Sequence, residues 1–170
     1  MLVSHFFLGH LIANTEDSFA EATPDTLPTT LLILKILFLL FTTPCTAHYF
    51  YTNDLYILLD VFLRQLNDLG PESEGLKHTF LRVLQPLLAN TQLSQSNYKK
   101  KELWDTLQSM ITCGFREVDG TTRRLVERNL KGIWFDSVRE TTRKDSIGGL
   151  LRFAGREGME SSLSLNTGQF

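Results

Sequence analysis

The sequence predicts an all-α fold, built as a fragment of a helical-repeat solenoid and followed by a disordered C-terminal tail. Apolar residues recur at intervals of three and four through residues 29–132, as they do along the buried face of a helix. No stretch alternates apolar and polar residues for long enough to indicate a strand. Successive helical patterns begin about 20 to 25 residues apart, and each is apolar on a broad face, which is typical of stacked helical repeats.

The first helix of the predicted domain carries the apolar run LLILKILFLLF, residues 31–41. This run contains a lysine and is shorter than the roughly 20 apolar residues that a membrane span needs, so we expect a buried core helix and no transmembrane segment. The helix should begin near Thr29 or Thr30 and end before Pro44, because the residue before a proline avoids the helical conformation. Residues 1–28 are expected to form a helix remnant and a proline-containing connector rather than a signal peptide, because basic residues are missing at the start.

Four further helices are predicted from apolar stripes at helical spacing. They lie within residues 55–69, 76–88, 98–114 and 121–130, and polar, glycine or proline-containing steps separate them. The last residues mix balanced charge with glycine and serine, so we expect them to be mostly disordered. The predicted parts of the chain are a helix remnant with connector (1–28), a helical domain (29–132) and the tail (133–170).

Tyr49, Phe50 and Tyr51 are three consecutive aromatic residues between two predicted helices. They cannot all point into the core, so at least one should lie near the surface. Two interpretations are open: the aromatic rings pack the turn between the helices, or they form a surface for another molecule.

The charge of the chain is unevenly distributed around a net value of −2. Residues 98–131 carry eight basic and five acidic side chains, whereas residues 1–97 carry four basic and nine acidic ones. This local excess of positive charge favours an acidic partner surface, and a solvated helix start is the alternative. Nucleic acid is not expected as a partner, because the isoelectric point is about 6.1 and no RNA-reading aromatic motif is present.

The sequence offers no constellation for catalysis, so an enzyme is not expected. Cys45 and His48 have a ligand-like spacing, but a structural zinc site needs four ligands, and Cys113 with His78 lacks a matching motif. We therefore expect a half-buried thiol beside a loop histidine, with no metal and no cofactor. Two cysteines without paired spacing fit a reducing intracellular compartment.

Three segments together carry a resemblance to a known family: LKILFLLFTTPCTAHYFYTNDLYILLDVFLRQLNDL, LKHTFLRVLQPLLANTQL, and YKKKELWDTLQSM followed by TTRRLVERNL. In order and spacing they are similar to the leucine-rich, armadillo-like domain that fungal low-dye-binding proteins share with the animal adapter called SH3 protein interacting with Nck, the WISH/DIP/SPIN family. The resemblance runs from about Leu31 to Gly132. Family members carry more helical repeat before this segment, so we expect an N-terminally truncated domain.

This resemblance implies an actin cytoskeleton regulator. Such a protein binds the actin-related-protein (Arp) complex, acts indirectly on actin, and activates the complex to nucleate linear filaments without a preformed mother filament. It would act in the cytoplasm, at cortical actin patches, and support endocytosis. The alternative is a non-activating helical scaffold that recruits endocytic adapter or cytoskeletal proteins.

The predicted protein-binding residues are polar side chains that frame the family signatures and were chosen for exposure and charge. For His78, beside Lys77 and one turn before Arg82, three roles are open: anion binding, a place in a partner surface, or a histidine that is solvated or hydrogen-bonded in place. The predicted set is His78, Arg82, Asn90, Gln92, Tyr98, Lys99, Lys100 and Arg124.

Overall fold

The computed structural model describes residues 26–112 and 118–144, and every regular element in them is a helix. The all-α prediction is therefore confirmed for this part of the chain. The helix remnant predicted at the N-terminus and most of its connector lie outside the described residues. The elements are α2 (Thr26–Thr42), α3 (Thr52–Asp68), η1 (Pro71–Ser73), α4 (Glu74–Asn90), η2 (Gln92–Gln95), α5 (Lys100–Thr112), α6 (Gly120–Leu130) and η3 (Ile133–Phe135), where η marks a 3₁₀ helix.

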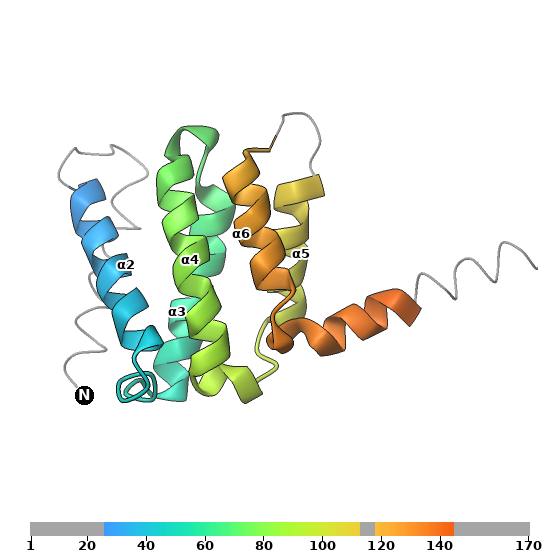
Figure 1. Ribbon diagram of the computed structural model, residues 1–170, viewed down its shortest axis with the longest axis horizontal. Coiled ribbons are helices and arrows are strands. Elements are labelled where there is room, and N and C mark those ends of the chain that lie inside the picture. The colour runs from blue at the N-terminus through green and yellow to red at the C-terminus, as the bar shows by residue number, and fades with distance from the viewer. Residues whose placement is uncertain (1–25, 113–117, 145–170) are drawn as a thin grey trace, which may run out of the picture. The chain divides into compact units, whose positions relative to one another are not determined.

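The helices of the compact unit form two layers (Figure 1). In the first layer, α2, α4 and α6 lie side by side and run in the same direction, with α4 in the middle and in contact with both neighbours. In the second layer, α3 and α5 contact each other and run in the opposite direction. The solenoid arrangement that the sequence predicted needs further repeats to be recognised, and it stays a prediction.

The core between the layers is made mostly of leucine and phenylalanine side chains, and every α-helix of the compact unit contributes to it. Phe62 of α3 and Phe80 of α4 are fully buried, and their rings meet edge to face with centroids 5.0 Å apart. At the turn after α2, Phe50 is buried and packs on Phe41, whereas the flanking Tyr49 and Tyr51 are 65% and 62% exposed. The three consecutive aromatics therefore divide between core and surface, as expected from their crowding.

Helix α2 begins at Thr26, before the predicted start at Thr29 or Thr30. Pro28 falls in its first turn, where a missing backbone N–H breaks no helical hydrogen bond. The helix ends at Thr42, before Pro44, as predicted. It buries one face rather than its whole circumference. No helix in the described residues is long and apolar enough to cross a membrane.

The compact unit continues past residue 132, the predicted end of the helical domain, to Phe135. The indole Nε1–H of Trp134 donates hydrogen bonds to the carbonyl oxygens of Leu93 (2.8 Å) and Ser96 (3.1 Å), and the ring of Phe135 is fully buried. These contacts tie η3 to the connection between α4 and α5. Residues 136–144, within the predicted tail, form a helix that belongs to a second unit.

Candidate protein-binding surface

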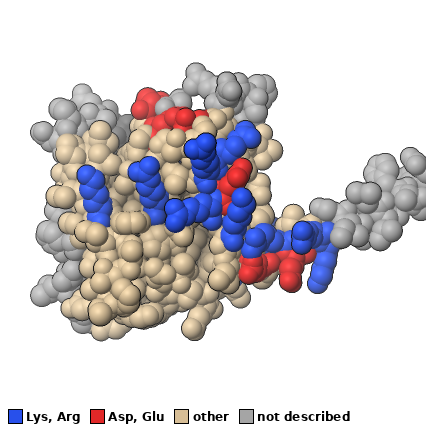
Figure 2. All heavy atoms as spheres, viewed as in Figure 1, with Lys and Arg blue, Asp and Glu red and all other residues tan. Residues whose placement is uncertain are grey.

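Exposed basic side chains form a row across the outer face of the α2–α4–α6 layer (Figure 2). On α6 they repeat at i, i+4 and i+7, which places them on one side of the helix. On α2 and α4 one basic residue each continues the row. We call these residues the basic row: Lys35 of α2, Arg82 of α4, and Arg124, Arg128 and Lys131 at and just after α6.

The basic row borders a shallow hollow between the three helices of the layer. Arg82 of α4 and Arg128 of α6 both line it, and Phe38 of α2, which is 39% exposed, contributes apolar surface. Arg128 and Lys131 also line a second hollow that reaches Trp134. Arginine beside exposed aromatic and aliphatic surface is the composition found in protein interfaces.

The positive charge of the basic row is largely uncompensated. Lys131 pairs with Glu127 of its own helix, at 3.7 Å. Within residues 26–112 and 118–144, no ion pair involves Arg82, Arg124 or Arg128. An acidic partner surface would therefore meet free guanidinium groups, which bind carboxylates in a bidentate geometry.

Tyr98 and Lys99, two of the predicted contact residues, make side-chain contacts within the fold. The hydroxyl group of Tyr98 donates a hydrogen bond to Asp60 Oδ2 (3.0 Å), and its ring stacks on Tyr56 with centroids 4.3 Å apart. Lys99 Nζ lies 3.1 Å from Asp60 Oδ1. The interaction with Asp60 raises the pKa of both Tyr98 and Lys99 above their ordinary values. This cluster joins the start of α5 to the middle of α3.

Three more predicted residues also make internal contacts. Lys100 Nζ lies 5.0 Å from the centroid of the Trp134 ring, and partial burial lowers the pKa of this lysine. Gln92 Oε1 accepts a hydrogen bond from the hydroxyl group of Thr52, the first residue of α3. The side-chain amide of Asn90 donates to the carbonyl oxygen of Phe41, at 3.0 Å. These contacts connect helices.

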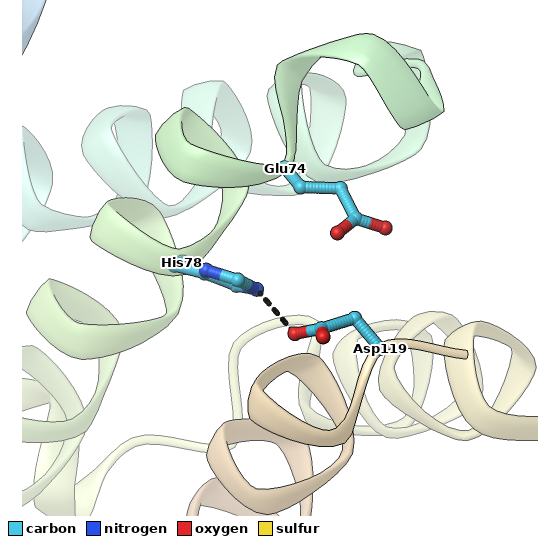
Figure 3. Close-up of side chains that lie close together, drawn as sticks. All are labelled: Glu74, His78 and Asp119. Atoms are coloured by element: carbon cyan, nitrogen blue, oxygen red, sulfur yellow. Dashed lines mark ion pairs between the residues drawn. The ribbon is translucent and has the colours of Figure 1, made fainter.

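His78 connects the first turns of α4 to the start of α6 (Figure 3). Its Nε2 lies 2.8 Å from Thr122 Oγ1 and 3.4 Å from Asp119 Oδ2. Asp119 is the N-cap of α6, and its Oδ2 accepts hydrogen bonds from the backbone N–H groups of Thr121 (2.9 Å) and Thr122 (3.3 Å). The bond from Thr121 is the main reason that the pKa of Asp119 is below its ordinary value. Of the roles open to His78, the structure shows a histidine that is hydrogen-bonded in place.

The structure thus brings only Arg82 and Arg124 of the eight predicted residues into the basic row. Arg128 and Lys131 lie in the basic segment 98–131 but are not among the eight predicted contact residues, although their spacing from Arg124 follows the helical repeat. Lys35 could not be found in this way, because it joins the row only when α2 packs on α4.

Cys45 departs from its prediction. It is a free, exposed thiol in the turn after α2, and His48 is exposed as well. The expectation of a half-buried thiol was wrong, because only Ala47 and Phe50 of this turn pack into the core. Cys113 lies outside the described residues.

Comparison of the sequence with known protein families finds one family that matches more than half of the chain. The sequence model of the family described as SPIN90/Ldb17, leucine-rich domain, matches residues 14–103. This range contains α2, α3 and α4 and ends within α5, so α6 and the larger part of the basic row lie beyond it.

Curated relatives give the same assignment. The chain is 48% identical to Protein dip1 of Schizosaccharomyces pombe over 82 residues, which are 48% of this chain and 22% of that protein. It is 41% identical to Protein LDB17 of Saccharomyces cerevisiae over 88 residues, 50% of this chain and 18% of that protein. It is 36% identical to Protein LDB17 of Eremothecium gossypii over 84 residues, which are 48% of this chain and 18% of that protein. The chain therefore spans about a fifth of the length of the curated relatives that it matches.

Proposed function

Because the chain belongs to the SPIN90/Ldb17 leucine-rich domain family, we propose that it binds the Arp complex and activates it to nucleate linear actin filaments without a preformed mother filament. The family match across α2, α3 and α4 is the observation that carries this proposal. The protein would act without catalysis of its own, in the cytoplasm at cortical actin patches, and would support endocytic patch assembly.

Activation by a binding protein requires a difference in affinity. A ligand that binds the active and inactive arrangements of the Arp complex equally well shifts nothing, however tightly it binds. To move the complex from about 1% to about 99% active, the ligand must prefer the active arrangement by roughly 10⁴-fold. A rigid two-layer helical unit suits this task, because a preformed surface loses little conformational entropy on docking.

We place the contact surface on the basic row, with Arg82 and Arg124 kept from the predicted set and Arg128 added. Free guanidinium groups beside an apolar hollow would complement an acidic surface of the Arp complex. His78, Asn90, Gln92, Tyr98, Lys99 and Lys100 would then contribute mainly by fixing the helices that carry the row.

Charge reversal tests this surface. We expect Arg82→Glu and Arg128→Glu each to weaken binding to purified Arp complex by about tenfold or more, because attraction becomes like-charge repulsion at a desolvated contact. Lys101→Glu is the matched control, since it makes the same change of charge at an exposed position on α5. Equal affinity of all three variants and the wild type, in a titration at physiological salt, would remove the basic row from the contact.

Activation itself is tested by fluorescence-monitored assembly of monomeric actin with Arp complex and no filament seeds. A lag that shortens as the protein is added would support the proposal. A second candidate function is a scaffold that docks through the basic row without activating the complex. A scaffold would bind the Arp complex in the titration but leave the lag unchanged.

A further inference from the structure

Three side chains with metal-binding groups converge between the first turns of α4 and the start of α6. Glu74 and His78 come from α4, and Asp119 precedes α6. One donor atom of each lies within 4.8 Å of the other two. Figure 3 shows the carboxylate groups of Glu74 and Asp119 and the imidazole ring of His78 directed into the same space.

Local structure holds two of these groups in place. Glu74 and His78 stand four residues apart on one helix, so they lie on the same face, one turn from each other. Asp119 is fixed by two hydrogen bonds that its Oδ2 accepts from backbone N–H groups, at 2.9 and 3.3 Å. The carboxylate of Glu74 is the adjustable member, because it has the longest free side chain of the three.

We propose that Glu74, His78 and Asp119 form a Zn²⁺ site, with the remaining coordination position open to water. Two ligand atoms of a tetrahedral zinc ion, each about 2.0–2.1 Å from the metal, lie roughly 3.4 Å apart. His78 Nε2 and Asp119 Oδ2 lie 3.4 Å apart. A change of side-chain rotamer at Glu74 closes the rest of the site.

The ligand set favours zinc over other common divalent ions. An imidazole nitrogen with two carboxylates suits Zn²⁺, whereas Ca²⁺ and Mg²⁺ prefer oxygen ligands throughout. Burial is also suitable, because the side chain of His78 is 17% exposed and that of Asp119 is 40% exposed, which leaves one side open to solvent. The positive charge of the ion would also reduce the repulsion between the carboxylates of Glu74 and Asp119.

Zinc would replace an existing contact at the site. His78 Nε2 now lies 2.8 Å from Thr122 Oγ1, so a metal-bound imidazole gives up that hydrogen bond and keeps its remaining proton on Nδ1. Coordination by all three residues would link α4 to the start of α6.

The sequence prediction considered His78 only together with Cys113 and did not include the two acidic ligands. Glu74 could have been found, because it stands four residues before His78, at the helical i, i+4 spacing.

Metal titration of the full chain tests the site. Zn²⁺ affinity is measured by competition with a chromophoric chelator, and Co²⁺ serves as a second probe because its visible absorption reports the coordination geometry. We expect one Zn²⁺ per wild-type chain and a melting temperature that rises with zinc concentration. Glu74→Gln, His78→Gln and Asp119→Asn should each weaken binding by at least about tenfold, since even loss of an outer-shell partner costs that much.

The variants separate coordination from folding. Asparagine caps a helix as well as aspartate does, so Asp119→Asn keeps the start of α6 while it removes the carboxylate ligand. His48→Gln is the control, because this exposed histidine stands three residues after the exposed thiol of Cys45, and the two would be the ligands of adventitious surface binding. Circular dichroism checks that all variants have the same helix content. The proposal is overturned if the wild type binds no Zn²⁺. It is also overturned if the Zn²⁺ affinity falls in His48→Gln but stays unchanged in His78→Gln and Asp119→Asn.

Discussion

Phe135→Ala should destabilise the compact unit severely, although the residue lies beyond the predicted end of the helical domain. Its ring is fully buried and meets Trp104 and Trp134 with centroids 5.4 and 4.9 Å apart. Truncation of a fully buried phenylalanine costs about 3–5 kcal/mol. The two aromatic contacts, each worth about 0.5–1.5 kcal/mol, place this case toward the upper end of that range. A domain of ordinary stability has only about 5–15 kcal/mol in total.

Urea unfolding followed by circular dichroism measures this cost, because the helix signal does not depend on the tryptophans beside the mutated ring. Ile133→Ala is the matched control: it lies two residues away in the same 3₁₀ helix but is 87% exposed, so its cost should stay below about 0.5 kcal/mol. If Phe135→Ala costs no more than Ile133→Ala, η3 is not part of the cooperative unit and the reasoning from burial fails.

Three further outcomes follow from single contacts. Phe80→Ala should cost about 3–5 kcal/mol in the same urea assay, because the ring is fully buried against α3. The lowered pKa of Asp119 means that its stabilising contribution is present above its ordinary pKa of 3.8 and is lost as pH falls through the folded value; the melting-temperature difference between wild type and Asp119→Asn should therefore shrink in acid. The raised pKa of Tyr98 means that the bond to Asp60 stabilises below its ordinary pKa of 10.0 and is lost as pH rises through the folded value, so Tyr98→Phe should reduce the alkaline destabilisation seen in the wild type.

The helices could be predicted because the apolar residues of each buried face recur at intervals of three and four in the sequence. This spacing puts six apolar residues on one helix face: Leu55, Leu58, Leu59, Phe62, Leu66 and Leu69. The first five are buried, whereas Leu69 follows the end of α3 and is partly buried. Helix ends were less accessible to this reasoning. The start of α2 was placed too late because proline was read as a breaker, whereas Pro28 occupies a first turn that tolerates it.

The end of the compact unit was hidden for a different reason. IWF is too short to show any periodicity, and what fixes it is tertiary: the Trp134 indole reaches two carbonyl oxygens that lie about 40 residues earlier in the chain. The internal contacts of two predicted contact residues were hidden for the same reason. Exposure was inferred from polarity and charge, but Tyr98 and Lys99 both contact Asp60 of α3. Neither segment alone shows that α3 and the start of α5 lie together.

The proposed zinc site and the proposed docking surface meet on α4. His78 and Arg82 stand one turn apart on α4, so the three ligands lie beside the α4 member of the basic row. Without a metal ion, their two carboxylates repel an acidic partner that approaches Arg82, and the charge of Zn²⁺ cancels both. Since salt screens exposed charges over about 10 Å, this effect reaches Arg82 more strongly than Lys131, which follows the far end of α6. Zinc should therefore strengthen docking of the wild type and leave docking of Asp119→Asn unchanged, whereas zinc-independent docking of both proteins would show that the two sites act separately.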